Sequence, residues 1–330
     1  MNILSKKIIV ITGPTASGKT SLAVKLSNNF SGEIISADSR QVYKGLDIGT
    51  GKDLKEYLVN GKKIKHWLID ICLPENEYNL KEFNYDSKNI VDDIISREKL
   101  PFIVGGTALY IDSIISNYKF PLPPPDRKLR DSIKDMSSHQ LCELLIRMYP
   151  FEKILPENIN SKPRLIRIIE SKFTDSGKEE AGNFPEEKYK FLIIAPYYER
   201  NIIHERIKKR LFERFDEGMI EEVEALHKNG TSWERLDSFG LEYRYVSRLI
   251  RKEITKKEME TTLLAKIRKL ARSQDVWFRK MERKGHVIHW VRNGNYSDSS
   301  SLITLFLNNM PLPEPDIQLK NLDYGARKLS

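Results

Sequence analysis

Residues 13–20, GPTASGKT, have the spacing G-x-x-x-x-G-K-[ST], which is typical of loops that hold phosphate groups. Glycines let the backbone curve around an anion so that several N–H groups point at it. Lys19 brings a positive charge to the terminal phosphates, and the Thr20 hydroxyl is a ligand that Mg²⁺ accepts. The pattern predicts a site for a diphosphate or nucleotide, with Mg²⁺ as cofactor, formed by Gly13, Pro14, Thr15, Ala16, Ser17, Gly18, Lys19 and Thr20.

A second candidate group is Asp38, a carboxylate that follows an apolar segment at 33–36. It could ligate Mg²⁺, act as a general base, or only cap a turn. Beside a phosphate site the first two roles are favoured. Asp70, which ends another apolar segment, is a rival magnesium ligand, and the residues alone leave that choice open.

The phosphate-loop pattern has meaning only between a strand and a helix, and both are expected here. Residues 8–11 are apolar and β-branched, and residues 21–27 have helical spacing without a breaker. The same alternation continues along the chain. Further strands are expected at 33–36, 65–71, 101–104, 190–195 and 286–291, and further helices at 80–98, 108–115, 201–215, 218–226 and 256–283.

Strands that alternate with helices predict an α/β fold, a P-loop NTPase-like parallel sheet flanked by helices. Ligands of such sheets bind at the carboxyl ends of the strands. Residues 13–20, Asp38 and residues 105–107 all follow expected strands. The sequence therefore predicts that they share one site at one edge of the sheet.

The proline-rich segment PLPPPD at 121–126 interrupts this alternation. The pattern after it is helical, so we expect an inserted helical subdomain at 120–186, without a strand. The α/β catalytic core with its C-terminal helices then comprises 1–119 and 187–295. Residues 296–330 contain PLPEP and are expected to form a loosely ordered tail.

Composition sets further limits on the function. The chain has 330 residues and a formal net charge of +9, which favours a polyanionic partner without establishing one. The two cysteines, Cys72 and Cys142, lack metal-ligand spacing, so we expect a reducing, cytoplasmic environment. A signal-peptide layout and an apolar run of about 18 residues are both missing, so no membrane association is expected.

Several motifs together resemble those of the tRNA dimethylallyltransferase (tRNA isopentenyltransferase) family, from about residue 7 to residue 280. They are GPTASGKT, SADSRQVY, IGTGK, LIDI, VGGTALY, RLIR and HERIKKR. The resemblance implies transfer of a dimethylallyl group from dimethylallyl diphosphate to N6 of the adenosine just 3′ of the anticodon in tRNA. The phosphate loop would then hold the leaving diphosphate. The expected partners of this monomeric enzyme are dimethylallyl diphosphate and the tRNA anticodon stem-loop.

The resemblance also assigns roles to individual residues. Asp38 would accept the proton from N6, Thr20 would ligate Mg²⁺, and Arg210 would clamp the diphosphate. Contacts with tRNA are implied for Asp38, Ser39, Arg40, Gln41, Thr107, Arg130, Arg164, Arg167 and Arg244.

Four positions depart from the usual family pattern. Gly51 stands where an alanine commonly precedes the lysine of IGTGK, and Glu242 where a glycine precedes the tyrosine–arginine pair. Trp67 replaces the second histidine of a pair before LIDI, and Ser273 replaces a second basic residue. Since the phosphate loop and DSRQ are intact, we expect the reaction to be the same as in the family. The four departures allow a different preference among tRNAs.

Other functions share parts of this pattern. A small-molecule or nucleotide kinase has the same phosphate loop, but it would respond to ATP and has no use for a basic helical insertion. Prenyl transfer to free AMP does not need the insertion either. A non-catalytic RNA-binding relative would not need an intact phosphate loop, Asp38 and Arg210.

Overall fold

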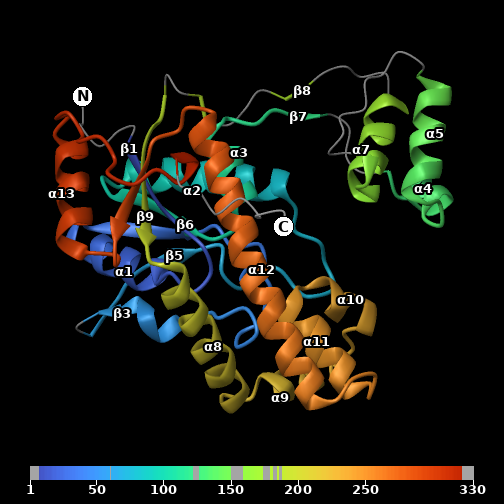
Figure 1. Cartoon of the computed structure of the whole chain (residues 1–330). Coiled ribbons are helices and arrows are strands. Elements are labelled where there is room, and N and C mark those ends of the chain that lie inside the picture. Colours follow the sequence, from blue (N-terminus) through green and yellow to red (C-terminus); the bar gives the residue numbers. More distant parts are fainter. Residues whose placement is uncertain are drawn as a thin grey trace, which may run out of the picture. The chain divides into compact units, whose positions relative to one another are not determined.

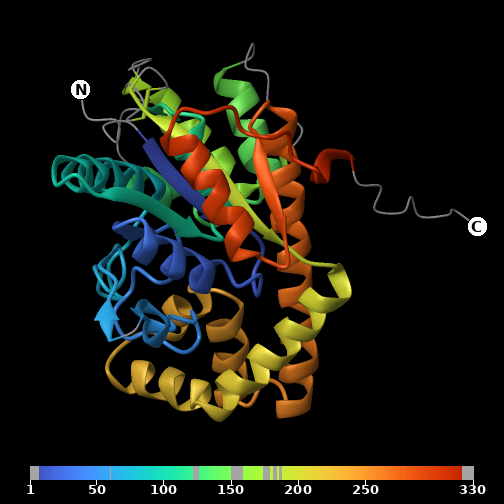
Figure 2. The same ribbon diagram turned by 90° about the vertical axis from the view of Figure 1, so that its left-hand side faces the viewer.

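The computed structural model describes residues 7–59, 61–121, 126–149, 159–173, 179–180, 184–185 and 188–321. The chain forms two compact units, which we describe separately. The larger unit comprises Met1–Asn117 with Phe184–Ser330, and the smaller one comprises Tyr118–Asn183. Figures 1 and 2 show the elements of both units.

A six-stranded sheet forms the centre of the larger unit (Figure 1). Its strand order is β10-β9-β1-β6-β2-β5. All neighbouring strands in this sheet run parallel, which confirms the predicted α/β fold. The strands are β1 (Lys7–Thr12), β2 (Gly32–Ser36), β5 (His66–Trp67), β6 (Leu100–Gly105), β9 (Lys190–Tyr197) and β10 (Ile288–Arg292).

The central strands are apolar because helices cover both faces of the sheet. Side chains alternate along β1, so that Ile8 and Val10 pack into one core while Ile9 and Ile11 pack into another. The first core receives side chains from α2 (Leu80–Ser96), α3 (Ala108–Ile115) and α12 (Lys256–Arg283), and the second from α1 (Lys19–Asn29) and α13 (Tyr296–Leu307).

Helices α2 and α12 begin at reciprocal capping boxes, whereas α1 does not. The Asn79 side chain accepts the N–H of Glu82, whose carboxylate accepts the N–H of Asn79 in return. Thr255 and Glu258 make the same exchange at the start of α12. Helix α1 follows Gly18 and has no side-chain cap, so its first N–H groups suit an anionic ligand.

A third core packs four helices of the larger unit against α12. Its fully buried side chains include Val223, Leu236 and Val246, each from a different helix. This core holds the helix that carries Arg210, because Ile203, Ile207 and Leu211 of that helix are buried in it. The four helices are α8 (Arg200–Asp216), α9 (Met219–Lys228), α10 (Trp233–Ser238) and α11 (Leu241–Ile250).

The smaller unit has a core of its own. Leu141, Leu145 and Leu165 are fully buried in it. Two short strands, β7 (Phe120–Pro121) and β8 (Glu179–Glu180), pair antiparallel, so the expectation of a strand-free insertion is wrong. The helices are α4 (Arg127–Ile133), α5 (Ser138–Met148) and α7 (Lys162–Phe173).

Two expectations about the larger unit are wrong. The strand expected at 65–71 is only two residues long, because Leu68 and Asp70 have φ values of +60° and +57° that end the extended backbone. The loosely ordered tail expected from residue 296 begins instead as helix α13. Further along it, Ile317 and Leu319 are buried in the first core. Buried apolar side chains therefore order this segment, although its prolines predicted a loosely ordered tail.

The remaining short elements lie outside the main sheet. Strands β3 and β4 pair with each other, antiparallel. None of the helices within the described ranges is long and apolar enough to cross a bilayer. These elements are η1 (Leu54–Tyr57), β3 (Leu58–Val59), β4 (Lys62–Lys63) and η2 (Leu319–Asn321).

Candidate active site

A cavity of about 490 Å³ opens where β1, β2 and β6 end. Its wall combines the loops that follow these strands with α8, α11 and α12. The sheet brings these loops together, because the carboxyl ends of parallel strands meet at one edge. Residues singled out by the sequence that line this cavity are Thr15, Lys19, Thr20, Asp38, Ser39, Arg40, Gln41, Thr107 and Arg210.

The phosphate loop is tightly curved ahead of α1. Gly13 and Gly18 have φ values of +144° and +77°, which favour glycine. The Ser17 N–H donates to the carbonyl of Pro14 at 3.3 Å and closes the turn. Ser17 itself is buried. An adjoining cavity of about 330 Å³ is lined by Ala16 and Gly18 and shares Lys19, Thr20, Arg210 and Arg214 with the first.

Lys19 lines both cavities. Its ammonium group donates to the Pro14 carbonyl at 3.3 Å. Burial, and next the positive charge of Arg210, lower the pKa of Lys19 to about 8. A negatively charged ligand would favour the protonated amine again, so this environment is suited to an anion.

Gln274 on α12 is a contact that the sequence analysis missed. Its Oε1 accepts the N–H of Thr15 at 2.9 Å, and its Nε2 donates to the carbonyl of Gly106 at 2.7 Å. One amide of the phosphate loop is therefore already bound by the protein. A single glutamine in a polar helix has no sequence signal of its own, because only the fold brings α12 to this loop.

Asp38 lies on the loop after β2. Its Oδ1 accepts the N–H of Arg40 at 2.9 Å, so the carboxylate does cap a turn. Among the described residues Oδ2 has no hydrogen-bond partner, and it can accept a proton or ligate a metal. The neighbouring Ser39 N–H donates to the Thr107 hydroxyl at 3.1 Å, which ties the loop after β2 to the loop after β6.

Gln41 supports the cavity wall from within the protein. Its Nε2 donates to the carbonyl of Gly51 at 3.1 Å, and its Oε1 accepts the Ser36 hydroxyl at 3.1 Å. Both ends of the side chain are therefore engaged. Its position beside the cavity follows from joining β2 to the loop at 49–51.

Asp70, the rival magnesium ligand, does not line the cavity. Its carboxylate pairs with the buried ammonium of Lys52, which also contacts Asp47 at 2.9 Å and the Tyr43 carbonyl at 2.5 Å. An ion pair of this kind stabilises the loop around it. Of the two carboxylates, Asp38 is the one that faces the cavity.

Glu222 on α9 holds the loop at 47–51, part of which lines the cavity. Its carboxylate accepts the N–H groups of Asp47, Ile48 and Gly49 at 3.0, 2.7 and 3.1 Å. The Tyr243 hydroxyl donates to it at 2.7 Å. One carboxylate thus fixes a glycine-rich loop, with its flexible backbone, at the edge of the cavity.

Arg210 and Arg214 point from α8 into the same region. Both line both cavities, although the sequence analysis singled out only Arg210. Arg210 contacts the Asp53 carboxylate at 4.0 Å, and Arg214 contacts Glu242 at 3.4 Å. Burial, and next the charge of Arg210, lower the pKa of Arg214 to about 10.

Apolar side chains cover another part of the wall. Leu109, Leu270 and Trp277 line the cavity, with Phe239 and Leu241. Leu109 and Leu270 are among the exposed large apolar residues, at 38% and 43%. Trp277 also packs against the first core, so its side chain contributes both to the core and to the cavity wall.

The remaining predicted tRNA contacts are not among the residues that line this cavity. Arg130 and Arg167 in the smaller unit both pair with Glu170, at 2.5 and 3.1 Å. Arg164 in the same unit is exposed. Arg244 in the larger unit donates to the Asp237 carbonyl at 3.0 Å.

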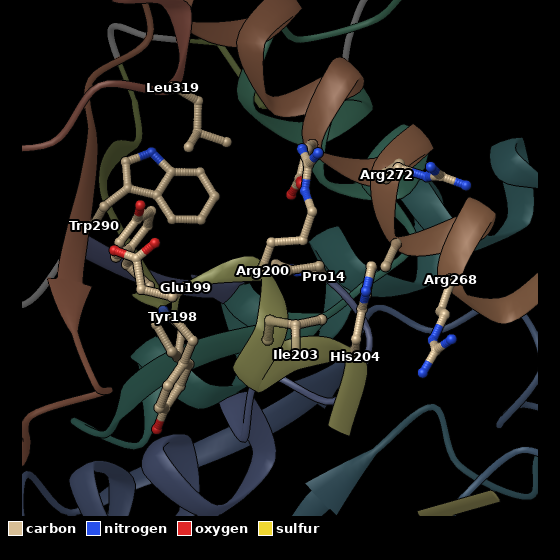
Figure 3. Close-up of a pocket in the computed structure, with 14 residues that line it drawn as sticks. Pro14, Tyr198, Glu199, Arg200, Ile203, His204, Arg268, Arg272, Trp290 and Leu319 are labelled. Atoms are coloured by element: carbon tan, nitrogen blue, oxygen red, sulfur yellow. The ribbon is translucent and has the colours of Figure 1, made fainter. Parts of the chain in front are cut away.

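A separate cavity of about 210 Å³ lies between α8, β10 and α12 (Figure 3). Of the phosphate-loop residues, Pro14 lines it. Helix α12 contributes one side to this cavity, at positions 268, 271, 272 and 275, and the opposite side to the first, at 270, 273, 274 and 277. Burial raises the pKa of Asp275 in this wall to about 6. The separate cavity thus lies across α12 from Lys19 and Asp38.

The donor set of the main cavity fits Mg²⁺ bound together with a phosphorylated ligand. Thr20 offers a hydroxyl and Asp38 a carboxylate oxygen in one wall. No group of three His, Cys, Asp or Glu side chains that could hold a metal occurs within the described ranges. This agrees with the way Mg²⁺ binds in phosphate sites, through one or two protein ligands, substrate oxygens and water.

Fold and cavity together define a P-loop α/β protein with a site for a phosphorylated ligand. The sequence profile described as "IPP transferase" matches residues 41–281. The chain belongs to this family, which confirms the resemblance seen in its motifs.

Similar proteins agree with this assignment. The chain is 45% identical over 286 residues to "tRNA dimethylallyltransferase 2" of Treponema denticola, covering 86% of this chain and 95% of that protein. It is 40% identical over 294 residues to "tRNA dimethylallyltransferase 1" of Syntrophus aciditrophicus, covering 89% and 96%. The crystal structure of the full-length tRNA isopentenylpyrophosphate transferase of Bacillus halodurans aligns with a TM-score of 0.68 and 27% identity, over 92% of this chain and 97% of that one.

Proposed function

We propose that this chain transfers a dimethylallyl group from dimethylallyl diphosphate to N6 of the adenosine 3′-adjacent to the anticodon of tRNA, and releases diphosphate. One observation carries the proposal: Lys19, Asp38 and Arg210 line one cavity although they are far apart in sequence. The names of the relatives support the reaction, since the chain is 45% and 40% identical to two tRNA dimethylallyltransferases.

The phosphate loop and α8 bind the diphosphate. The uncapped start of α1 offers N–H groups, Lys19 adds an ammonium, and Arg210 adds a guanidinium. Negative charge grows on the diphosphate as its bond to C1 of the allyl group breaks. These donors therefore stabilise the transition state more than the bound substrate.

Asp38 acts on the acceptor. The exocyclic amine of adenine is a weak nucleophile, and a positioned base helps as the new N6–C1 bond forms. The Oδ2 atom of Asp38 takes the N6 proton, while Oδ1 keeps the loop in place through the Arg40 N–H.

The apolar wall keeps water from the reacting carbon. An allyl group with cation character would otherwise be captured by water, and Leu109, Leu270 and Trp277 cover this part of the cavity. The target adenosine must leave its stacked loop to enter. Unstacking costs least in a single-stranded loop, which fits an anticodon loop as substrate.

Mg²⁺ bound with the diphosphate would neutralise part of the leaving-group charge. Thr20 is the residue that would hold it, through its hydroxyl.

Contacts with the rest of the tRNA complete the proposal. Ser39, Arg40 and Gln41 contact the target nucleotide, and Thr107 and Arg244 make further contacts with the tRNA. Arg130, Arg164 and Arg167 on the smaller unit contact the anticodon arm. The enzyme works as a monomer in the cytoplasm, where Cys72 and Cys142 stay reduced, as both are free here.

Incubation with labelled dimethylallyl diphosphate and bulk tRNA tests the function directly. We expect label in tRNA at the adenosine next to the anticodon, without ATP. Phosphorylation of a small molecule with ATP in place of prenyl transfer would show a kinase. tRNA binding without transfer would show a non-catalytic RNA-binding protein.

A further inference from the structure

Two of the residues that depart from the family pattern, Gly51 and Glu242, both contact Arg214. The Glu242 carboxylate lies 3.4 Å from Nη1 of Arg214. A Cβ atom placed on Gly51 would lie only 1.9 Å from Nη2 of the same side chain. Both departures are therefore explained by the arginine that they adjoin.

Gly51 makes room for two guanidinium groups at once. The same added Cβ would lie 2.1 Å from Nη2 of Arg210, so the tips of both arginines converge on this glycine. Any larger residue would displace one or both of them. The φ of Gly51, +67°, also favours glycine.

Carboxylates around the two arginines hold them only in part. Arg214 uses Nη1 for both of its contacts, with Glu242 and with the Gly49 carbonyl at 3.3 Å. Its Nη2 has no hydrogen-bond partner among the described residues. Asp53 reaches Arg210 only at 4.0 Å. Neither guanidinium has the bidentate carboxylate partner that its fork can accommodate.

Two like charges side by side in a partly buried site are unfavourable unless an anion joins them. The Arg214 side chain is only 11% exposed, and Lys19 lines the same two cavities. Burial, and next the charge of Arg210, lower the pKa of Arg214 to about 10, because both disfavour its charged form. A diphosphate would supply the missing negative charge.

We infer that Arg214 is a second guanidinium that binds the leaving diphosphate beside Arg210, held in place by Glu242 and accommodated by Gly51. The inference rests on the proposed function. In the reaction the C1–O bond breaks with its electron pair going to the diphosphate, the N6–C1 bond forms, and the N6 proton goes to Asp38. Nη2 of Arg214 donates to a diphosphate oxygen, whose charge grows during this step.

Binding of inorganic diphosphate to the full chain with Mg²⁺, measured by calorimetry, tests the inference. We expect Arg214→Met to weaken this binding about tenfold or more, because it removes a charged hydrogen bond. Arg214→Lys keeps the positive charge but loses the forked guanidinium. Its diphosphate affinity should therefore lie between that of the unmodified protein and that of Arg214→Met. The matched control is Lys208→Met, an exposed cation on the same helix, which should bind as the unmodified protein does.

If Arg214 has only a structural role, diphosphate binding should not depend on it in a variant that still folds. Arg214→Met leaves the Glu242 carboxylate without its partner, so the double variant Arg214→Met with Glu242→Gln removes that cost and keeps the test valid if the single variant does not fold. The inference is overturned if the folded double variant binds diphosphate within twofold of the unmodified protein. It is also overturned if only tRNA affinity falls, measured by filter binding.

These outcomes are separable from failure of the proposed function. A chain that binds diphosphate through Arg214 but transfers no dimethylallyl group would retain the inference and lose the function. A chain that transfers the group with unchanged diphosphate affinity in the double variant would retain the function and lose the inference.

Discussion

At the scale of single residues, the site depends on side chains whose two ends do different things. One oxygen of Asp38, a residue that lines the cavity, holds its own loop through the Arg40 N–H, and the other has no hydrogen-bond partner among the described residues. Lys19 donates to the Pro14 carbonyl while its charge stays poorly accommodated. Local geometry and chemistry can therefore be separated by substitutions that keep one and remove the other.

Asp38→Asn should keep the bond to the Arg40 N–H and remove the base. We expect single-turnover transfer to fall roughly 10²–10⁴-fold, with tRNA affinity unchanged within a few-fold. The matched control is Asp70→Asn, which disturbs the Lys52 ion pair and should lower the melting temperature with little effect on the rate. A slow Asp70 variant beside a fast Asp38 variant would reverse the assignment of the two carboxylates.

The pKa of Lys19 predicts how diphosphate affinity depends on pH. With a pKa near 8 in the free protein, the amine loses its proton as the pH rises from 7 to 9, and affinity should fall over that range. Lys19→Met should bind more weakly at pH 7 but lack this part of the dependence. Comparing the two proteins by calorimetry cancels the titration of the ligand itself. Parallel pH profiles would mean that Lys19 is not the titrating group.

At the scale of elements, α12 is a shared wall that also connects to the catalytic loops. Its Gln274 accepts the Thr15 N–H and donates to the Gly106 carbonyl, and so joins the loops after β1 and β6. The capping box at Thr255 and the buried stripe of the helix keep it in place. The position of the phosphate loop therefore depends on a side chain that lies 259 residues later in the chain.

Gln274→Ala removes both hydrogen bonds and should loosen the phosphate loop. We expect KM for dimethylallyl diphosphate to rise about three- to tenfold, since each lost hydrogen bond costs roughly 0.5–1.5 kcal/mol. Lys269→Ala, an exposed position on the same helix, is the control and should leave KM unchanged. If Gln274→Ala lowers the melting temperature while KM for dimethylallyl diphosphate stays the same, the glutamine is a packing contact only.

At the scale of the whole molecule, the chemistry and the proposed grip on the anticodon arm belong to different units. The cavity is built wholly from the larger unit. Two of the arginines proposed to contact tRNA also have a structural partner, because the buried Glu170 carboxylate, 1% exposed, pairs with Arg130 and Arg167. Arg164 is exposed on the same helix as Arg167.

Salt dependence separates these purposes. Arg164→Ala should reduce the slope of log affinity for tRNA against log salt by a little under one unit. Arg130→Ala should instead destabilise the smaller unit by roughly 1–3 kcal/mol, because it removes a partner from the buried Glu170 carboxylate. Affinity for dimethylallyl diphosphate should change in neither variant. An unaltered salt slope for Arg164→Ala would exclude it as a phosphate contact.

The sequence alone determined those features of the protein that depend on residues close together in the chain. The spacing of residues 13–20 predicts the phosphate loop, since its flanking strand and helix are adjacent in the chain. The alternation of apolar segments predicts the parallel sheet, because buried strands and amphipathic helices have distinct periods. The motifs from GPTASGKT to HERIKKR identify the family.

Only the tertiary structure decided which distant side chains meet. It distinguished the roles of Asp38 and Asp70, because the Asp70 carboxylate forms an ion pair with Lys52. It brought Gln274 to the phosphate loop and Arg214 to Gly51, contacts that span residues far apart in the chain. It also ordered the tail, because Ile317 and Leu319 find a core that only the folded sheet and α12 provide. Local sequence sets each element's period, but contacts between elements exist only after packing.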